Sequence, residues 1–222
     1  MATLLASDAA YREIKHWIQS SRVAPGHLID EAEAMKGLGM SRTPVREALL
    51  RLQAEGYIEI KRHKGIRVLP LSAGDMRELY QVISALEGAA VTLIAERRPA
   101  PEEFLVIENA IAEMQQRQVS QEVDKWGEAD ETFHRELLRL SGNGRLYTAG
   151  CQMRDFAKRA HFAALRMQTD AYRAHSTRSH ANLLKALRGP HPTQAVEQHQ
   201  SQRKRGEDAL VGVVEKFQLT SL

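Results

Sequence analysis

The chain has 222 residues, a formal net charge of +3 and one cysteine, Cys151. This length fits one large domain or two small ones. The mean hydropathy is −0.42, and no apolar run approaches the ~18 residues that span a bilayer. The N-terminus lacks the features of a signal peptide, and a single cysteine excludes an intrachain disulfide. We therefore expect a cytoplasmic protein without a membrane partner.

The excess of positive charge lies in one short segment. Residues 1–70 hold 11 Lys and Arg against 8 Asp and Glu, whereas residues 71–222 hold 20 of each kind. Within residues 41–67 there are seven basic and three acidic side chains, a net charge of +4. A local basic surface attracts polyanions such as nucleic acids, although many solvated surfaces carry as much charge.

Three short helices are expected in the first third of the chain. Residues 8–21 place apolar side chains at helical spacing, and Pro25-Gly26 then predicts a turn. A second helix is expected over residues 30–37. A third begins after Ser41 or Thr43, because either residue can cap a helix N-terminus.

A β-hairpin is expected after the third helix, which Gly56 ends. Two β-prone runs, residues 57–60 and 66–69, are joined by the basic turn KRHKG, in which Gly65 supplies a permissive backbone. Three helices followed by a hairpin within residues 1–70 form the pattern of a winged helix-turn-helix, so we assign these residues to such a domain.

The remainder of the chain is predicted to be wholly helical. We expect a linker from Pro70 to Gly74. Apolar residues at steps of three or four then predict six helices, over about 76–93, 104–114, 126–140, 146–167, 171–188 and 193–217. The fold class is therefore mainly α, with an all-α helical bundle over residues 71–222 following the winged helix.

Two arginines on the third helix are candidates for reading DNA. Arg42 and Arg46 lie four residues apart and share one helix face, while Val45, Leu49 and Leu52 form the opposite apolar face. In the major groove, arginine can donate two hydrogen bonds to O6 and N7 of guanine. The N-terminus of the helix also favours a phosphate.

The hairpin tip offers further basic groups. Arg62 and Lys64 could contact the DNA backbone or the minor groove.

Arg42 and Arg46 of the third helix also have an alternative interpretation, as part of a solvated face or as partners in ion pairs with Glu47 and Glu55. For an arbitrary pair of arginines at this spacing, the alternative is the more common outcome.

Residues 11–69 closely resemble the GntR family of bacterial repressors. The motif SRTPVREAL, followed by L-x-x-EGY and a glycine-tipped wing, is long and specific. Glu31 matches the acid near the start of the family's second helix, but Ala32 stands where many members carry a further DNA-contacting arginine. The operator preference is therefore expected to differ from the common one. The resemblance places the family's recognition-helix arginines at Arg42 and Arg46 and its wing-tip glycine at Gly65. The full set of expected DNA contacts is Ser41, Arg42, Thr43, Arg46, Arg62, Lys64 and Gly65.

A second group of residues has the chemistry of a metal site. Asp130 and His134 lie four residues apart on one predicted helix, and His180 lies far along the chain. A carboxylate with imidazoles suits Zn, Ni, Mn or Fe. Spacing alone equally allows a surface aspartate and ordinary helix histidines.

Residues 72–217 resemble the all-helical effector domain, called FCD, that follows the GntR winged helix. The block D-x-x-FH-x-x-L-x-x-x-SGN begins at Asp130. The resemblance implies a divalent transition metal (Zn, Ni or Mn) held by Asp130, His134 and His180, with Gln202 at the fourth ligand position. His199 lies three residues earlier on the same helix. Because a glutamine carbonyl is a poorer zinc ligand than an imidazole, we expect weak metal binding at most.

The effector pocket is also expected to differ from that of the family. Ile83 stands where many members place an arginine that pairs with an effector carboxylate. We therefore expect a small-molecule effector that is either not the usual organic acid or is a carboxylate held by other residues. Candidates on the helix over 146–167 are Arg154 and Arg159, with His161 and Arg166 as further possibilities.

The sequence thus predicts a ligand-responsive, sequence-specific DNA-binding transcriptional regulator that is not an enzyme. By resemblance it acts as a repressor, and two copies bind a short palindromic operator as a homodimer. One alternative is a metal-dependent enzyme using Asp130, His134 and His180. Against it, no catalytic motif appears, and helical spacing turns Glu128 and Glu131 away from the metal candidates. The other alternative is a non-specific architectural DNA binder.

Overall fold

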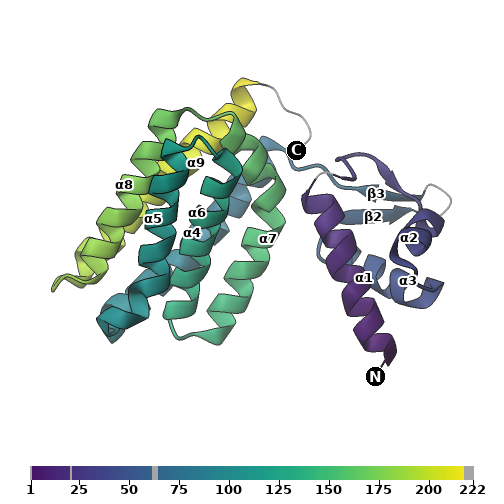
Figure 1. Ribbon diagram of the computed structural model, residues 1–222, viewed down its shortest axis with the longest axis horizontal. Coiled ribbons are helices and arrows are strands. Elements are labelled where there is room, and N and C mark those ends of the chain that lie inside the picture. Colours follow the sequence, from purple (N-terminus) through teal and green to yellow (C-terminus); the bar gives the residue numbers. More distant parts are fainter. Residues whose placement is uncertain (1, 21, 62–64, 218–222) are drawn as a thin grey trace. The chain divides into compact units, whose positions relative to one another are not determined.

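The computed structural model describes residues 2–20, 22–61 and 65–217. The chain divides into two compact units, of which the first extends to Ser72 and the second begins at Ala73. Figure 1 shows a mixed unit of helices and strands and a unit built from helices. The fold is therefore mainly α, as the sequence predicts.

The N-terminal unit is a winged helix-turn-helix. Strand β1, which the sequence did not predict, pairs antiparallel with β3 and gives the sheet order β1-β3-β2. A strand of two residues is too short to show the alternation that identifies a strand. The elements are α1 (Ala2–Gln19), β1 (Leu28–Ile29), α2 (Glu31–Leu38), α3 (Arg42–Ala54), β2 (Ile58–Lys61) and β3 (Gly65–Val68).

The core of this unit forms where α1 packs on α3. Ile14 and Ile18 of α1 are buried, and so are Val45, Leu49 and Leu52 of α3. Burial of such side chains stabilises each by roughly 1.5–3 kcal/mol relative to exposure. The apolar face of α3 therefore points inward, and its opposite face is left for solvent or a ligand.

The second unit is a bundle of helices that run alongside one another in Figure 1. The predicted linker was too long, because α4 begins at Ala73 and includes Gly74; Asp75 in its first turn complements the helix dipole. The elements are α4 (Ala73–Arg97), the short 3₁₀ helix η1 (Pro101–Phe104), α5 (Leu105–Val119), α6 (Val123–Leu140), α7 (Gly144–Arg166), α8 (Asp170–Leu187) and α9 (Pro192–Lys216).

The sequence Ser141-Gly142-Asn143 ends one helix and begins the next. Gly142 has a φ of +73°, the left-handed conformation that glycine adopts without strain. The Asn143 side chain accepts hydrogen bonds from the backbone N–H groups of Arg145 and Leu146, both at 3.1 Å. This N-cap explains why α7 begins two residues before the predicted position.

The core of the helical unit centres on Trp126 and Phe133 of α6. Both side chains are fully buried, and the Trp126 indole N–H donates to the Thr177 hydroxyl at 3.1 Å. Residues from α4, α5, α8 and α9 pack around them. This core fixes the relative positions of α6 and α8, which carry the candidate metal ligands.

Helix α4 is long and apolar enough to cross a membrane by length and composition alone. In the structure it packs against α6, α7 and α9. Its buried side chains include Met76, Tyr80, Ile83, Val91 and Ile94. It is therefore a core helix of the bundle.

Candidate functional site

The turn between α2 and α3 fixes where the candidate DNA-reading helix begins. The Asp30 side chain caps α2 by accepting from the N–H groups of Ala32 and Glu33, at 2.7 and 3.0 Å. Gly39, with φ +63°, ends α2 in the left-handed conformation. Ser41 then occupies the N-cap position of α3 in an extended conformation, without a side-chain capping bond.

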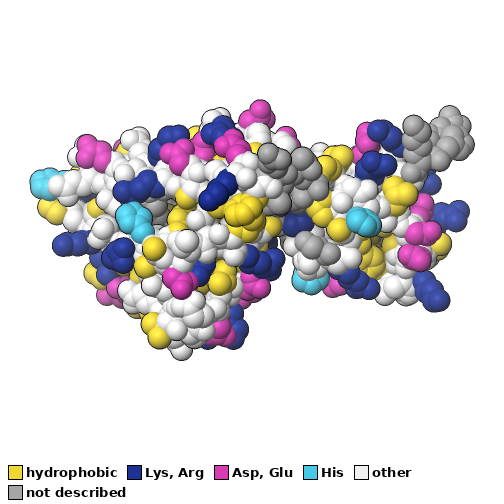
Figure 2. Space-filling model, turned by 90° about the horizontal axis from the view of Figure 1, so that it is seen from above, with side chains coloured by type: hydrophobic (Ala, Val, Ile, Leu, Met, Phe, Trp, Pro, Cys, Tyr) yellow, Lys and Arg dark blue, Asp and Glu magenta, His cyan; other side chains and the backbone are white. Residues whose placement is uncertain are grey.

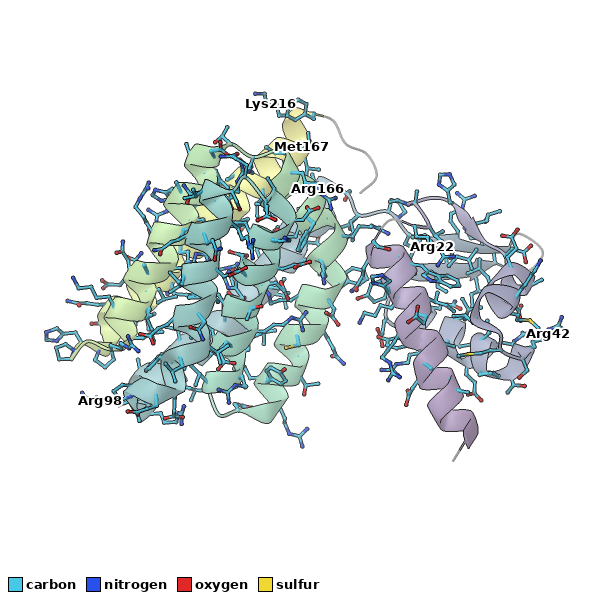
Figure 3. The ribbon with its side chains drawn as sticks, viewed as in Figure 1. Arg22, Arg42, Arg98, Arg166, Met167 and Lys216 are labelled. Carbon is cyan, nitrogen blue, oxygen red and sulfur yellow. The ribbon has the colours of Figure 1, made fainter. Side chains whose placement is uncertain are left out.

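The first turn of α3 presents polar side chains to solvent. Ser41, Arg42, Thr43 and Arg46 are all exposed. The Arg42 side chain is 75% exposed and lies 3.8 Å from a Glu31 carboxylate oxygen. Figure 3 shows Arg42 projecting outward from the surface of its unit. The pairing with Glu31 was not among the ion pairs considered from the sequence.

The hairpin places Gly65 beside these helices. Its φ is +84°, and the register pairs Lys61 with Gly65 at the tip end of β2 and β3. Arg62 and Lys64, predicted to contact DNA, lie outside the described residues. Figure 2 shows Lys and Arg side chains around the visible face of this unit, with hydrophobic side chains between them.

A hollow of about 450 Å³ adjoins Arg46, between α3 and the sheet. Arg46, Leu50, Lys61 and Gly65 line it, together with Leu28. Leu50 follows Arg46 on the same helix face and is 54% exposed. Apolar groups beside arginines can contact thymine methyl groups in the major groove. Sequence analysis did not identify Lys61 and Leu50 as candidate DNA contacts. Leu50 lies four residues after Arg46 on the same helix, and Lys61 lies at the end of the strand that leads to the hairpin tip.

In the helical unit, Asp130, His134 and His180 converge in a buried cluster. One potential ligand atom from each lies within 4.8 Å of the other two. His180 Nε2 lies 3.2 Å from Asp130 Oδ1 and 3.3 Å from His134 Nε2. All three side chains are almost completely buried. The structure therefore brings together the three residues that the sequence singled out.

The outer ring nitrogens of the two histidines already have acceptors. His180 Nδ1 donates to the Ser176 carbonyl at 2.6 Å, and His134 Nδ1 donates to Glu87 Oε2 at 3.0 Å. In a neutral ring, each of these bonds places the single N–H on Nδ1 and leaves a lone pair on Nε2. Two lone pairs and a carboxylate then face one another in a buried space, which is unfavourable unless a cation lies between them.

The electrostatics of the cluster bear on the charge states of Asp130 and His134. Burial lowers the pKa of His134 to about 4, so its imidazole is neutral near pH 7. Burial raises the pKa of Asp130, but its contacts with His134, His180 and His161 outweigh burial and hold that pKa well below its usual range. An ionised carboxylate with a neutral imidazole is the form in which these side chains bind metals.

Glu87 of α4 is a central residue that sequence analysis missed. It is fully buried and contacts His134, His199 Nε2 at 3.4 Å, Arg154 Nη1 at 2.7 Å and Arg203 Nε at 3.6 Å. Burial raises its pKa, but the contact with His134 and the two guanidinium groups outweigh burial and hold the pKa well below its usual value. The sequence did contain a signal for Glu87, because this residue lies four residues after Ile83 on the buried face of an apolar helix.

The predicted effector arginines both lie inside the bundle. Arg154 donates to Glu87 and, with two nitrogens, to Glu131 at 2.7 and 3.1 Å. Arg159 is also buried, at 8% exposure. Ile83 is fully buried, as expected. The positive charge of Arg154 is thus balanced within the protein.

Gln202 of α9 is buried, and its Oε1 accepts no hydrogen bond from a described residue. Among the described residues it makes no hydrogen bond to Asp130, His134 or His180. His161 of α7 instead approaches Asp130, with its Nε2 3.7 Å from Oδ2.

Two families match this chain. The FCD domain matches residues 78–201, and the family described as bacterial regulatory proteins, gntR family, matches residues 6–68. An uncharacterised HTH-type transcriptional regulator from the TAR-I ttuE-ttuC' intergenic region of Agrobacterium vitis is 38% identical over 133 residues, covering 59% of this chain and 78% of that protein.

A second relative and a solved structure are also similar to this chain. The HTH-type transcriptional repressor RspR of Escherichia coli strain K12 is 26% identical over 134 residues, covering 59% of this chain and 57% of that protein. The structure of E. coli McbR/YncC superposes with a TM-score of 0.79 at 18% identity, covering 96% of this chain and 98% of that one. At this identity the likeness shows a shared fold.

Proposed function

This chain belongs to the GntR family of bacterial transcriptional regulators, with an FCD domain, and from that premise we propose that it binds a short palindromic operator as a homodimer. It is a ligand-responsive DNA-binding regulator rather than an enzyme. Such a protein acts where the bacterial chromosome lies, in the cytoplasm.

The observation that carries the DNA-binding site is the outward face of α3. Its inner face is buried in the core, while Ser41, Arg42, Thr43 and Arg46 are exposed at its N-terminal end. This placement suits two arginines donating to guanine and a helix N-terminus facing a phosphate. We propose DNA contacts for Gly65, and also for Arg62 and Lys64, which lie outside the described residues.

One winged helix offers few base contacts, so tight specific binding requires a second copy. A two-fold dimer matches an inverted repeat because each protomer meets one half-site. We propose that the helical unit supplies the dimer contact. The name of the RspR relative supports repression as the outcome, since a dimer on an operator excludes other proteins from it.

Within the helical unit we propose a divalent transition metal, Zn, Ni or Mn, held by Asp130, His134 and His180. The donor set fits, because two imidazole lone pairs and a carboxylate converge in a buried space. The Ser176 carbonyl and the Glu87 carboxylate orient the two rings, the usual arrangement around metal-bound histidines. A bound metal would supply a fixed positive charge that cross-links α6 and α8 and attracts an anionic effector.

We propose that the effector is a small carboxylate that binds beside this metal, attracted by its positive charge. Arg154 already balances Glu87 and Glu131, so an acid entering the bundle gains little from it unless those ion pairs rearrange. Arg159 remains a candidate contact. Effector binding shifts DNA affinity only if it favours one arrangement of the two DNA-binding units over another.

Salt dependence separates a specific regulator from an architectural DNA binder. The test first selects a tightly bound duplex from random DNA. Fluorescence anisotropy then measures the affinity of the purified protein for this selected duplex and for a scrambled duplex of equal length at several salt concentrations. We expect the selected duplex to bind at least about 10³-fold more tightly at physiological salt. Equal affinities that fall together with salt would support the architectural alternative.

A further inference from the structure

His161 of α7 approaches the proposed metal ligands from a helix that the family resemblance does not use. Its Nε2 lies 3.7 Å from Asp130 Oδ2, and His134 Nε2 lies 3.8 Å from the same oxygen. Ligands that share a tetrahedral zinc ion at its usual bond lengths are roughly 3.4 Å apart. His161 is therefore as close to Asp130 Oδ2 as His134 is, although the described donor atoms that all lie within 4.8 Å of one another are those of Asp130, His134 and His180.

The two ring nitrogens of His161 have very different surroundings. Nδ1 lies 2.7 Å from the Tyr80 hydroxyl, whereas Nε2 is buried and forms no hydrogen bond with a described residue. A buried nitrogen without a hydrogen-bond partner is costly. With Tyr80 accepting from Nδ1–H, the lone pair on Nε2 faces Asp130, the outer-shell arrangement seen for metal-bound histidines.

Helix α9, which carries Gln202, meets the cluster at a different place. Its neighbours His199 and Arg203 contact Glu87, at 3.4 and 3.6 Å, and Glu87 is an outer partner of His134. Gln202 Oε1 is likewise buried without a hydrogen bond from a described residue, but an amide oxygen is a poorer ligand for zinc than the imidazole that His161 offers. In this structure α9 thus supplies outer contacts, and α7 supplies the side chain beside Asp130.

We propose that His161 is the fourth protein ligand of the metal, in place of Gln202. This inference rests on the proposed metal site of Asp130, His134 and His180 and assigns its missing donor. Three imidazoles and one carboxylate form a donor set suited to zinc. Of the other two metals proposed for the site, this set suits nickel better than manganese. The site then joins α6, α7 and α8, and its affinity exceeds that expected with a glutamine carbonyl.

The test uses the full-length protein, stripped of metal and titrated with Co²⁺ alone, with zinc competition to obtain affinities. The wild type is expected to bind one Co²⁺ per chain. His161→Gln is expected to weaken binding at least about tenfold and to alter the visible absorption band of Co²⁺. The matched variant Gln202→Ala is expected to change neither. Circular dichroism of the metal-free variants checks that each is folded.

A measurement on the unmodified protein avoids dependence on folding of the variant. In the proton NMR spectrum of the Co²⁺ form, each ligating histidine contributes one exchangeable, strongly shifted ring N–H signal. Three such signals are expected, from His134, His161 and His180. Two signals, or loss of affinity in Gln202→Ala but not in His161→Gln, would overturn the assignment of His161 while leaving the metal site intact. A wild-type protein that takes up no Co²⁺ would overturn the metal site itself.

Discussion

Arginine has two different roles in this chain, and burial separates them. The Arg42 side chain is 75% exposed and has only a long contact to Glu31, so its donors are available to a base edge. Arg154 is 5% exposed, and its donors are used by Glu87 and Glu131. Sequence spacing marks both as candidate ligand contacts, but only the structure distinguishes a recognition group from a balanced internal charge.

Replacing Arg42 by alanine tests the recognition role. If Arg42 donates two hydrogen bonds to guanine, Arg42→Ala weakens binding to the selected operator by about 1–3 kcal/mol and relaxes base preference at one position in each half-site. Fluorescence anisotropy with duplexes substituted at each position measures both effects.

The matched control is Arg178→Ala, which removes an exposed arginine from α8. It has the same charge change and is expected to leave operator affinity nearly unaltered. An equal loss of affinity by Arg42→Ala on every DNA sequence would show that Arg42 contacts phosphate only.

Glu87 provides a test of the buried charge network. Glu87→Gln leaves Arg203 without its carboxylate and leaves Arg154 with Glu131 alone, and removing one partner of a buried ion pair destabilises by about 3–5 kcal/mol. Urea unfolding of the metal-free protein measures the free energy of unfolding. The control Glu128→Gln, on the exposed side of α6, should change it by less than about 0.5 kcal/mol. Equal stability of the two variants would refute a structural role for Glu87.

At the scale of secondary-structure elements, close approach between α6 and α7 depends on glycine. A Cβ added at Gly150 would lie 2.6 and 2.7 Å from the two Leu138 methyl carbons. Gly150→Ala therefore forces these helices apart or strains Leu138, and we expect a loss of about 1–3 kcal/mol in the free energy of unfolding.

Gly206 of α9 is the matched control, because a Cβ there meets no atom within 4 Å. Gly206→Ala removes backbone freedom from the unfolded chain and should stabilise the protein by about 0.5–1 kcal/mol. The same urea experiment compares the two substitutions. Stabilisation by both would show that the α6–α7 contact is looser than in this structure.

The sequence predicted the helices well because their apolar residues recur at helical spacing and glycine or proline ends them. It missed β1, since two residues carry no period, and it began α7 too late because Asn143 was not recognised as an N-cap. The three proposed ligands Asp130, His134 and His180 were found from spacing and resemblance. Glu87 and His161 were not placed at the cluster, because which residues meet across four helices depends on tertiary packing.

For the molecule as a whole, tight and specific DNA binding requires two copies of the chain. A single α3 presents Arg42 and Arg46 as described candidates for bidentate guanine contacts, too few for tight specific binding, since its third arginine, Arg51, pairs with Asp8 and Glu55. Light scattering during gel filtration is expected to give twice the 25.0 kDa mass of one chain. A mass of one chain at micromolar concentration, with or without operator DNA, would contradict the proposed dimer.

Selection of bound sequences from random duplex DNA, using the purified metal-loaded protein, decides whether this protein recognises a specific sequence as a dimer. We expect enrichment of one inverted repeat, with a guanine in each half-site whose preference is lost in Arg42→Ala. A bound pool that stays as diverse as the input, with no shared motif, would contradict a sequence-specific dimeric regulator.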